Sequence, residues 1–316
     1  MSFEGSLEMN IAVVGIGGVG GYYGGKLARR YAGQRDFQVT FIARGEHLRE
    51  IRERGLQQIT EEGTFTAVPD RATDDAARCG VFDLILFCVK TYDLEESARL
   101  LNENIDERTL AISLLNGVDN AERLRVVLPQ ADVLNGCVYI GAQMVHPGVV
   151  RQAGGSCKLF FGPENGGNHD YRMIERLLRD AGIKAEYRED IKTVVWEKYL
   201  FVSPLASATT YLNMTMGEFV EHGESRRLLE GLLDEVELIA RAQHVSLPED
   251  IHKISLEKIS LFPYEAKSSM QMDFEKGNRT EVETFTGYIV RFAKNHGIST
   301  PFHEEVYNYL LKRLAA

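Results

Sequence analysis

Hydrophobic and polar positions along the first 190 residues predict strands and helices in turn. Short apolar runs indicate buried strands, and apolar residues that recur every three to four positions indicate helices. The predicted strands are residues 9–16, 37–43, 81–90, 109–116 and 132–143. The predicted helices are residues 17–32, 45–55, 93–105, 120–128 and 170–182. Strands that alternate with helices favour a parallel sheet with helices on both faces.

The pattern changes toward the second half of the chain. Short β-rich runs over 148–153 and 157–163 predict an antiparallel extension, and 184–190 predicts a further strand. Beyond them only helical periodicity remains, over residues 191–212, 224–243, 251–276, 281–296 and 302–314. We therefore predict an α/β domain of the Rossmann type over 1–189 and an all-α domain over 190–316.

Composition excludes several classes of function. The chain of 316 residues is 44% hydrophobic and 26% charged, as is ordinary for a globular protein large enough for two cores. Its formal net charge of −10 argues against a nucleic-acid or anionic-membrane partner. No apolar run approaches the length of a membrane span, and the first ten residues do not read as a secretory signal. We expect a cytoplasmic protein.

Metal-ligand spacing is absent from the sequence. The four cysteines lie far apart, and the eight histidines form no HxH or HExxH group, so we predict no metal site and reduced, buried thiols. No diagnostic stripe marks an oligomer interface, which leaves a homodimer through the helical domain open.

A glycine-rich loop follows the first predicted strand and opens the first helix. Its GxGxxG pattern is typical of a dinucleotide-binding turn, in which the helix N-terminus faces the pyrophosphate. The competing interpretation is a glycine turn without a ligand. The predicted cofactor-binding residues of the loop are Gly15, Ile16, Gly17, Gly18, Val19 and Gly20.

Arg44 follows the second strand, where an NAD-selective enzyme usually places an acid. A guanidinium pairs with a 2′-phosphate that a carboxylate would repel, so Arg44 favours NADP(H). An arginine merely solvated in a loop is the alternative.

Lys90 and Asn116 come at the ends of two further strands. Ligands of open α/β sheets bind outside the carboxyl ends of strands, so both side chains are candidates for the cofactor and substrate cleft. A surface lysine and a local Asn-Gly turn remain the alternatives.

Lys198 stands in an otherwise apolar helical stretch just after the predicted domain boundary. An ammonium there would stabilise the negative charge that develops on a ketone oxygen during hydride transfer and would supply the proton. The alternative is a lysine whose amine reaches water along its own stem. Pro204 is predicted to disturb this helix, and the hydroxyls around it, such as Ser203 and Ser207, suggest a cleft wall.

The chain resembles the ketopantoate reductase family (2-dehydropantoate 2-reductases) over nearly its whole length. The likeness rests on VVGIGGVGG, ARGEHL, CVKTYD, LLNGVDN, GCVYIGAQ with HPGVV, WEKYLF, MGEF and KSSMQMDFEKGNRTEVE, in that order. It implies a Rossmann-type domain, a helical domain and NADPH-dependent reduction of a 2-oxo acid.

The resemblance also implies roles for individual residues. It makes Lys198 the catalytic lysine, and it places Ser269 near the substrate and Glu281 near the substrate and the nicotinamide ribose, with a share in catalysis. Ala142 falls where family backbone touches NADP, and Asn116 where an asparagine lines the cleft. Ser269 and Glu281 also lie beside capping-box patterns, Ser268 with Gln271 and Thr280 with Glu283, which offer a purely structural interpretation.

The sequence departs from the family at three positions. Family members commonly carry asparagines where this chain has Val202, Ala206 and Met216. Reduction of 2-dehydropantoate to pantoate, for pantothenate and coenzyme A synthesis, is the first functional hypothesis. The alternatives are the same chemistry on another, more apolar 2-oxo acid or ketone, and a protein that senses NADP without catalysis.

Overall fold

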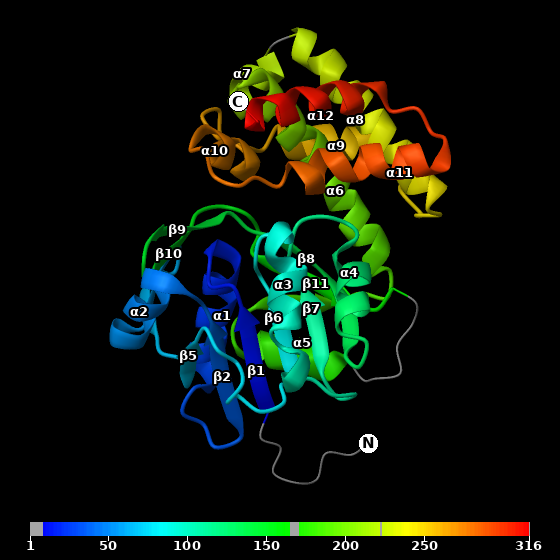
Figure 1. Cartoon of the computed structure of the whole chain (residues 1–316). Helices are drawn as coiled ribbons and strands as arrows, with labels where there is room; N and C mark the ends of the chain where they lie inside the picture. Colours follow the sequence, from blue (N-terminus) through cyan, green and yellow to red (C-terminus); the bar gives the residue numbers. More distant parts are fainter. Residues whose placement is uncertain (1–8, 165–170, 222, 316) are drawn as a thin grey trace. The chain divides into compact units, whose positions relative to one another are not determined.

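The computed structural model describes residues 9–164, 171–221 and 223–315 (Figure 1). The chain divides into two compact units. The first comprises the chain up to Leu115 and Asp119–Ile191, and the second comprises Asn116–Val118 and the chain from Lys192 onward.

The first unit is built on an eight-stranded sheet in the order β12-β11-β8-β7-β6-β1-β2-β5. Its strands are β1 (Met9–Val14), β2 (Phe37–Ile42), β5 (Arg71–Thr73), β6 (Leu84–Phe87), β7 (Leu110–Ser113), β8 (Asp132–Tyr139), β11 (Lys158–Gly162) and β12 (Lys184–Tyr187). Neighbouring strands are parallel from β8 to β5, whereas β11 runs antiparallel to β8. This confirms the antiparallel extension for the run over 157–163. The central strands β6 and β7 are fully buried apolar runs, as strands covered on both faces require.

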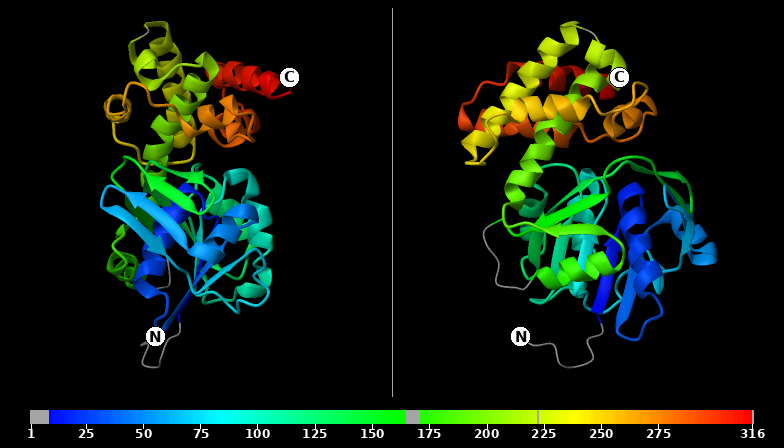
Figure 2. Two further views of the ribbon diagram at one scale, coloured as in Figure 1. Left: turned by 90° about the vertical axis from the view of Figure 1, so that its left-hand side faces the viewer. Right: turned by 180° about the vertical axis from the view of Figure 1, so that it is seen from behind.

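Helices cover both faces of this sheet (Figures 1 and 2). On one face α3 (Leu94–Arg99) and α4 (Asn120–Val127) contribute to a single hydrophobic cluster with the sheet. A separate cluster on the other face holds α1 (Gly18–Tyr31), α2 (Gly45–Arg54) and α5 (Arg172–Asp180). Two short 3₁₀ turns flank α3, η1 (Thr91–Asp93) and η2 (Asn102–Asn104).

A second sheet, absent from the sequence-based prediction, packs on α1 (Figure 2). Its four strands run in the order β4-β3-β10-β9. They are β3 (Leu56–Thr60), β4 (Gly63–Ala67), β9 (Ala142–His146) and β10 (Val149–Gln152). The run over 148–153 therefore belongs to this sheet, where β10 lies antiparallel to β9 and parallel to β3.

Glycines on α1 allow this sheet to approach. A Cβ at Gly18, Gly21 or Gly25 would collide with Ala142 of β9, Val150 of β10 or Gln58 of β3, respectively. Gln58 is buried, and its amide donates to the carbonyl oxygens of Gly21 at 2.8 Å and Tyr22 at 2.9 Å. Helix α1 is therefore held between two sheets, and glycines stand where it approaches β3, β9 and β10 most closely.

The described residues of the second unit form helices and no strand. The helices are α6 (Ile191–Leu212), α7 (Met216–Glu221), α8 (Gly223–Ala242), α9 (Ile251–Ile259), α10 (Ser269–Glu275), the π-helical turn η3 (Glu283–Gly287), α11 (Tyr288–His296) and α12 (Pro301–Leu314). The single helix predicted over 251–276 is wrong. Pro263 lies in the segment that separates α9 from α10, and proline cannot continue a helix without losing a backbone hydrogen bond.

Helix α8 packs against α11 and α12 in this unit. Its apolar face is buried. Beside that face the buried carboxylate of Glu235 accepts from the backbone N–H groups of Phe302 and His303, each at 2.8 Å, and from the His303 ring. A carboxylate at a helix N-terminus is favoured by the orphan N–H groups and by the helix dipole, so Glu235 fixes the start of α12 on α8.

Candidate active site

The glycine loop begins where β1 ends. Gly15 has φ +88°, which only glycine adopts readily, and a Cβ there would lie 2.7 Å from Val89 Cγ1. A Cβ at Gly20 would overlap the carbonyl oxygen of Gly15, so the third glycine lets α1 press onto the loop. A Cβ at Gly17 would meet nothing within 4 Å.

These three glycines fit a pyrophosphate. Gly17 is the N-cap of α1, and the first turn of that helix carries no acid to repel an anion. Open space beside Gly17, together with the N–H groups of the helix N-terminus, is the arrangement that phosphates bind. Ile16, Gly18 and Val19 complete the loop.

Arg44 is the N-cap residue of α2 and lies next to the end of β2. Its side chain is 80% exposed, and its guanidinium donates to Asp93 Oδ2 at 3.1 Å. Exposed ion pairs contribute only about 0–1 kcal/mol, so little free energy opposes a move of this guanidinium toward a phosphate.

His47 was not a predicted site residue, but its ring links the glycine loop to the turn between β9 and β10. Its Nδ1 accepts from the backbone N–H of Gly148 at 2.8 Å, so the ring proton lies on Nε2 and is donated to the Ile16 carbonyl at 2.6 Å. Burial lowers the pKa of His47, and the bond to Ile16 raises it back in part. The signal was present in the sequence, because His47 is part of the ARGEHL motif.

Lys90 and Ala142 lie where their strands meet the loops of the first unit. Lys90 follows β6, is half-buried and precedes the turn η1, its carbonyl accepting from Asp93 N at 2.9 Å. Ala142 opens β9, with its backbone directly against Gly18 of the glycine loop.

Lys198 and Asn116 meet within the second unit. Lys198 is half-buried on α6, and its Nζ donates to Asn116 Oδ1 at 2.8 Å. The amine is therefore held by an amide oxygen instead of extending alone into solvent. Two residues 82 positions apart, each predicted separately as part of the site, are joined by one hydrogen bond.

Ser269 and Glu281 differ in burial. Ser269 is exposed at the first position of α10, whose N-cap Ser268 accepts from Gln271 N at 3.1 Å, as the capping-box pattern predicts. Glu281 is only 4% exposed and lies two residues before η3. The carboxylate of Glu283, the predicted partner of Thr280, accepts from Tyr307 and pairs with Arg291.

The hydroxyls near Pro204 do not form a cleft wall as predicted. Helix α6 continues through Pro204, and Ser203 and Ser207 are fully buried. Ser203 donates to the Phe285 carbonyl at 2.6 Å, and Ser207 shares a hydrogen bond of 2.8 Å with Thr286. These serines bind the π-helical turn, a helix–helix contact that the local sequence could not reveal.

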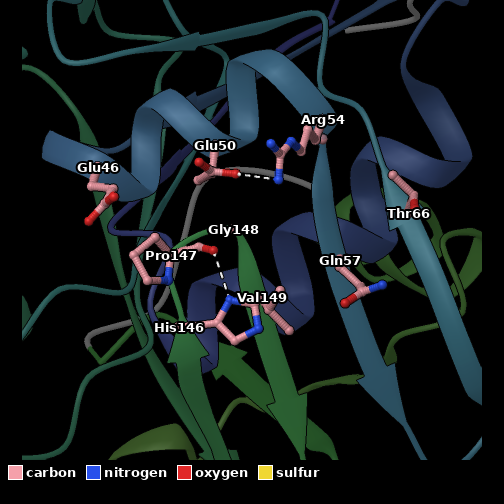
Figure 3. Close-up of a pocket in the computed structure, with 10 residues that line it drawn as sticks. Glu46, Glu50, Arg54, Gln57, Thr66, His146, Pro147, Gly148 and Val149 are labelled. Atoms are coloured by element: carbon pink, nitrogen blue, oxygen red, sulfur yellow. Dashed lines mark hydrogen bonds and ion pairs between the residues drawn. The ribbon is translucent and has the colours of Figure 1, made fainter.

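A cavity of about 470 Å³ opens elsewhere in the first unit (Figure 3). It lies between α2, the strands β3 and β4, and the turn from β9 to β10. Glu46, Glu50 and Arg54 project toward it from α2, and Arg54 pairs with Glu50 at 3.4 Å (Figure 3). None of the predicted site residues lines it, and two carboxylates are a poor environment for a phosphate.

Neither a membrane span nor a metal cluster is found in the described part of the chain. No described helix is long and apolar enough to cross a bilayer. Within residues 9–164, 171–221 and 223–315, no three His, Cys, Asp or Glu side chains are grouped so that they could hold a metal ion.

Comparison with known proteins gives a consistent family. Residues 11–166 match the family model described as ketopantoate reductase PanE/ApbA, and residues 190–313 match the model of its C-terminal domain. The chain is 32% identical over 296 residues to the 2-dehydropantoate 2-reductase of Halobacterium salinarum, covering 93% of this chain and 95% of that protein.

Two solved structures are similar over almost the whole chain. The 2-dehydropantoate 2-reductase of Porphyromonas gingivalis is 35% identical, with a TM-score of 0.83 and coverage of 96% of this chain and 99% of that one. The PanE/ApbA family ketopantoate reductase of Ralstonia eutropha is 28% identical, with a TM-score of 0.88 and coverage of 97% and 99%.

Proposed function

The chain belongs to the ketopantoate reductase family, whose members are oxidoreductases acting on a CH–OH/C=O group, and we propose that it reduces a 2-oxo acid with NADPH. The first substrate we propose is 2-dehydropantoate, reduced to pantoate for pantothenate and coenzyme A synthesis. The observation that carries the proposal is the Lys198 amine held by Asn116 at 2.8 Å.

We assign the cofactor to the residues that the sequence and the family resemblance predict for it. The glycine loop and the N-terminus of α1 bind the pyrophosphate, the backbone at Ala142 and the side chains of Lys90 and Asn116 add contacts, and Arg44 binds the 2′-phosphate. The open space at Gly17 and the exposed guanidinium support this assignment. NADPH, when bound, supplies a hydride to the carbonyl carbon of the substrate.

Lys198 holds a proton at Nζ for the substrate oxygen. Negative charge grows on that oxygen as the carbonyl carbon accepts the hydride, and an ammonium stabilises such charge most where water is excluded. Transfer of the proton from Nζ to the oxygen completes the alcohol, and solvent restores the proton to the amine. Asn116 orients the amine by accepting one of its hydrogen bonds.

Ser269 and Glu281 complete the proposed site. Ser269, exposed at the start of α10, is assigned to the substrate. Glu281, which is buried, is assigned to the substrate, to the nicotinamide ribose and to catalysis. These two roles follow from the family resemblance.

The test compares the turnover of Lys198→Ala with that of a control variant in which another lysine of α6, Lys192, is replaced by alanine. NADPH oxidation is followed with 2-dehydropantoate and a panel of 2-oxo acids, and NADPH binding is measured separately. We expect Lys198→Ala to lose about 10²–10⁴-fold in kcat while it still binds NADPH.

Lys192→Ala is the control, because Lys192 is also a half-buried lysine of α6, with its Nζ bound to the Gln243 carbonyl at 3.1 Å. It should keep wild-type turnover. A folded wild-type protein that binds NADPH but reduces no member of the panel would show the sensing function instead.

A second candidate is a 2-oxo acid with a more apolar side chain. Val202 and Ala206 follow Lys198 at successive turns of α6, and Met216 opens α7; Val202 is half-buried and the other two are buried. A pocket without amides loses its hydrogen bonds to substrate hydroxyls and gains affinity for apolar groups. Val202→Asn should then raise kcat/KM for 2-dehydropantoate relative to branched 2-oxo acids that lack a hydroxyl group, and an unchanged ratio would remove this candidate.

A further inference from the structure

The π-helical turn η3 lies between Glu281 and helix α11 in the second unit. Single π-helical turns inside α-helices are rare and are frequent at functional sites. This turn is tied directly to Glu281, because the Glu281 carbonyl accepts from the N–H groups of Thr284 and Phe285, each at 3.0 Å. The conformation of η3 therefore fixes the backbone from which the Glu281 side chain projects.

Side chains of α6 bind the carbonyl groups of this turn. The Tyr199 hydroxyl shares its proton between the carbonyl oxygens of Thr284, at 2.7 Å, and Phe285, at 3.0 Å. Ser203, one turn further along α6, donates to the Phe285 carbonyl at 2.6 Å. Ser207, a further turn along, bonds to the Thr286 hydroxyl at 2.8 Å.

The spacing places these three hydroxyls in one line. Residues four apart on a helix lie on the same face, so Tyr199, Ser203 and Ser207 form a row that runs along η3. All three are at most 2% exposed, and so is Phe285. Buried carbonyl groups that are bound in this way resist any shift of the turn, since a shift would leave polar atoms without partners.

The same helix carries Lys198. Lys198 immediately precedes Tyr199, so the proton donor and the row of hydroxyls are parts of one rigid element. Because α6 is bound to η3 through Tyr199 and Ser203, the positions of Lys198 and Glu281 relative to each other are kept fixed. Reaction geometry is sensitive to this, because a displacement of about 1 Å can reduce a rate about 10²-fold.

We propose that Tyr199 and Ser203 are positioning residues: their hydroxyls bind the π-helical turn and thereby hold Glu281 in register with Lys198. This inference rests on the proposed function, because it assumes that Lys198 and Glu281 act in the reaction. It assigns the row of hydroxyls on α6 a part in catalysis that acts through Glu281 and requires no contact with the substrate.

The experiment removes single hydroxyls and measures kcat, KM and NADPH binding separately. Tyr199→Phe should lower kcat about tenfold, with the dissociation constant of NADPH changed less than about twofold. Ser203→Ala should lower kcat less, because Phe285 keeps the bond from Tyr199. Ser203→Thr, which restores a hydroxyl, should recover most of the activity.

Ser255→Ala is the matched control. Ser255 is also fully buried in the second unit, but its hydroxyl donates to Ile251 within its own helix, at 2.8 Å. The control should leave kcat unchanged whatever it does to stability. Equal kcat for wild type, Tyr199→Phe and Ser203→Ala in folded protein would overturn the proposal.

A double-mutant cycle with Glu281→Gln separates this inference from the proposed function. If Tyr199 acts through Glu281, Tyr199→Phe should cost little further activity in the Glu281→Gln background. Full additivity would refute the positioning role, whereas wild-type activity of Glu281→Gln itself would refute the proposed role of Glu281. If Tyr199→Phe does not fold, the same cycle is run with Ser203→Ala, and the same outcomes decide.

Discussion

Arg44 projects most of its side chain into solvent from the N-cap of α2, paired only with Asp93 among the contacts that the structure shows for it. Arg44→Ala should weaken NADPH binding by about 10–100-fold, the equivalent of a charge-assisted bond to phosphate. Because NADH lacks the 2′-phosphate, the affinity of Arg44→Ala for NADH should fall by less than about threefold. The measurement is the dissociation constant of each nucleotide.

Arg49→Ala provides the comparison for Arg44. Arg49 is also exposed on α2 and pairs with Glu46 at 3.0 Å. Arg49→Ala should leave the affinities for NADPH and for NADH unchanged. Equal losses of NADPH and NADH affinity in Arg44→Ala would show that the guanidinium does not bind the 2′-phosphate.

His47 predicts a pH dependence of stability in the first unit. Its pKa is lowered from 6.5 in the folded chain by burial, so the unfolded chain binds this proton more readily. The contribution of His47 to stability is therefore complete above pH 6.5 and falls as the pH is lowered from 6.5 through the folded-state value. Protonation of Nδ1 would also remove the acceptor for Gly148.

The check is unfolding temperature against pH for wild type and His47→Gln. The variant should be less stable at pH 7.5 and should lose less stability on acidification. His296→Gln, at an exposed histidine, is the control and should follow the wild-type curve. Parallel curves for wild type and His47→Gln would exclude His47 as the titrating group.

At the scale of elements, α1 packs closely on the small sheet because glycines stand at its tightest contacts. Gly25→Ala would drive a methyl group into Gln58, which cannot retreat without losing its bonds to Gly21 and Tyr22. Overpacking of this kind costs about 1–3 kcal/mol, which urea unfolding should show. Gly223→Ala, on α8 with nothing within 4 Å of the new methyl, should change stability by less than about 0.5 kcal/mol.

A second variant tests the cause of the Gly25→Ala loss. Gln58→Ala removes the obstructing amide, so the double variant should be more stable than the sum of the two single losses predicts. Strict additivity would show that the small sheet does not press on α1 at this point.

The helices and strands that the sequence predicts correctly are those marked by a hydrophobic pattern within their own residues. The apolar runs at β1, β6 and β7 and the periodicity of α6 needed no tertiary information. The small sheet was missed because β3 and β4 are largely polar, and their close contact with α1 depends on glycines that no local pattern marks as a packing surface. The break near Pro263 has a local cause that the sequence shows, because proline does not continue a helix.

The site shows the same division between local and tertiary information. Motifs identified Lys198 and Asn116, which the structure joins by a hydrogen bond. No pattern indicated that Ser203 would bind Phe285, 82 residues away, because only the packing of α6 on η3 brings them together. The roles assigned to the site residues stay predictions.

On the scale of the whole molecule, the predicted fold class and family are confirmed by the architecture and by the two matched family models. Both matches together extend from residue 11 to residue 313. The substrate was not predictable to the same degree, because a substrate is selected by a few pocket side chains whose exchange leaves the fold unchanged.

All four cysteines lie in the first unit, and none of them is in a disulfide in the structure. Cys79, Cys137 and Cys157 are buried and Cys88 is half-buried. We expect four titratable thiols per chain in denaturant without reductant, and slow, incomplete reaction in the native state. A reductant should not shift the unfolding temperature; a shift would reveal a disulfide.

The placement of α1 between two sheets also bears on the kinetics of nucleotide exchange. Backbone donors that are already immobilised lose little freedom when a ligand arrives. The pyrophosphate would then bind to backbone N–H groups that are already in place. Reduced and oxidised nucleotide would exchange without a change in the conformation of the turn at Gly17.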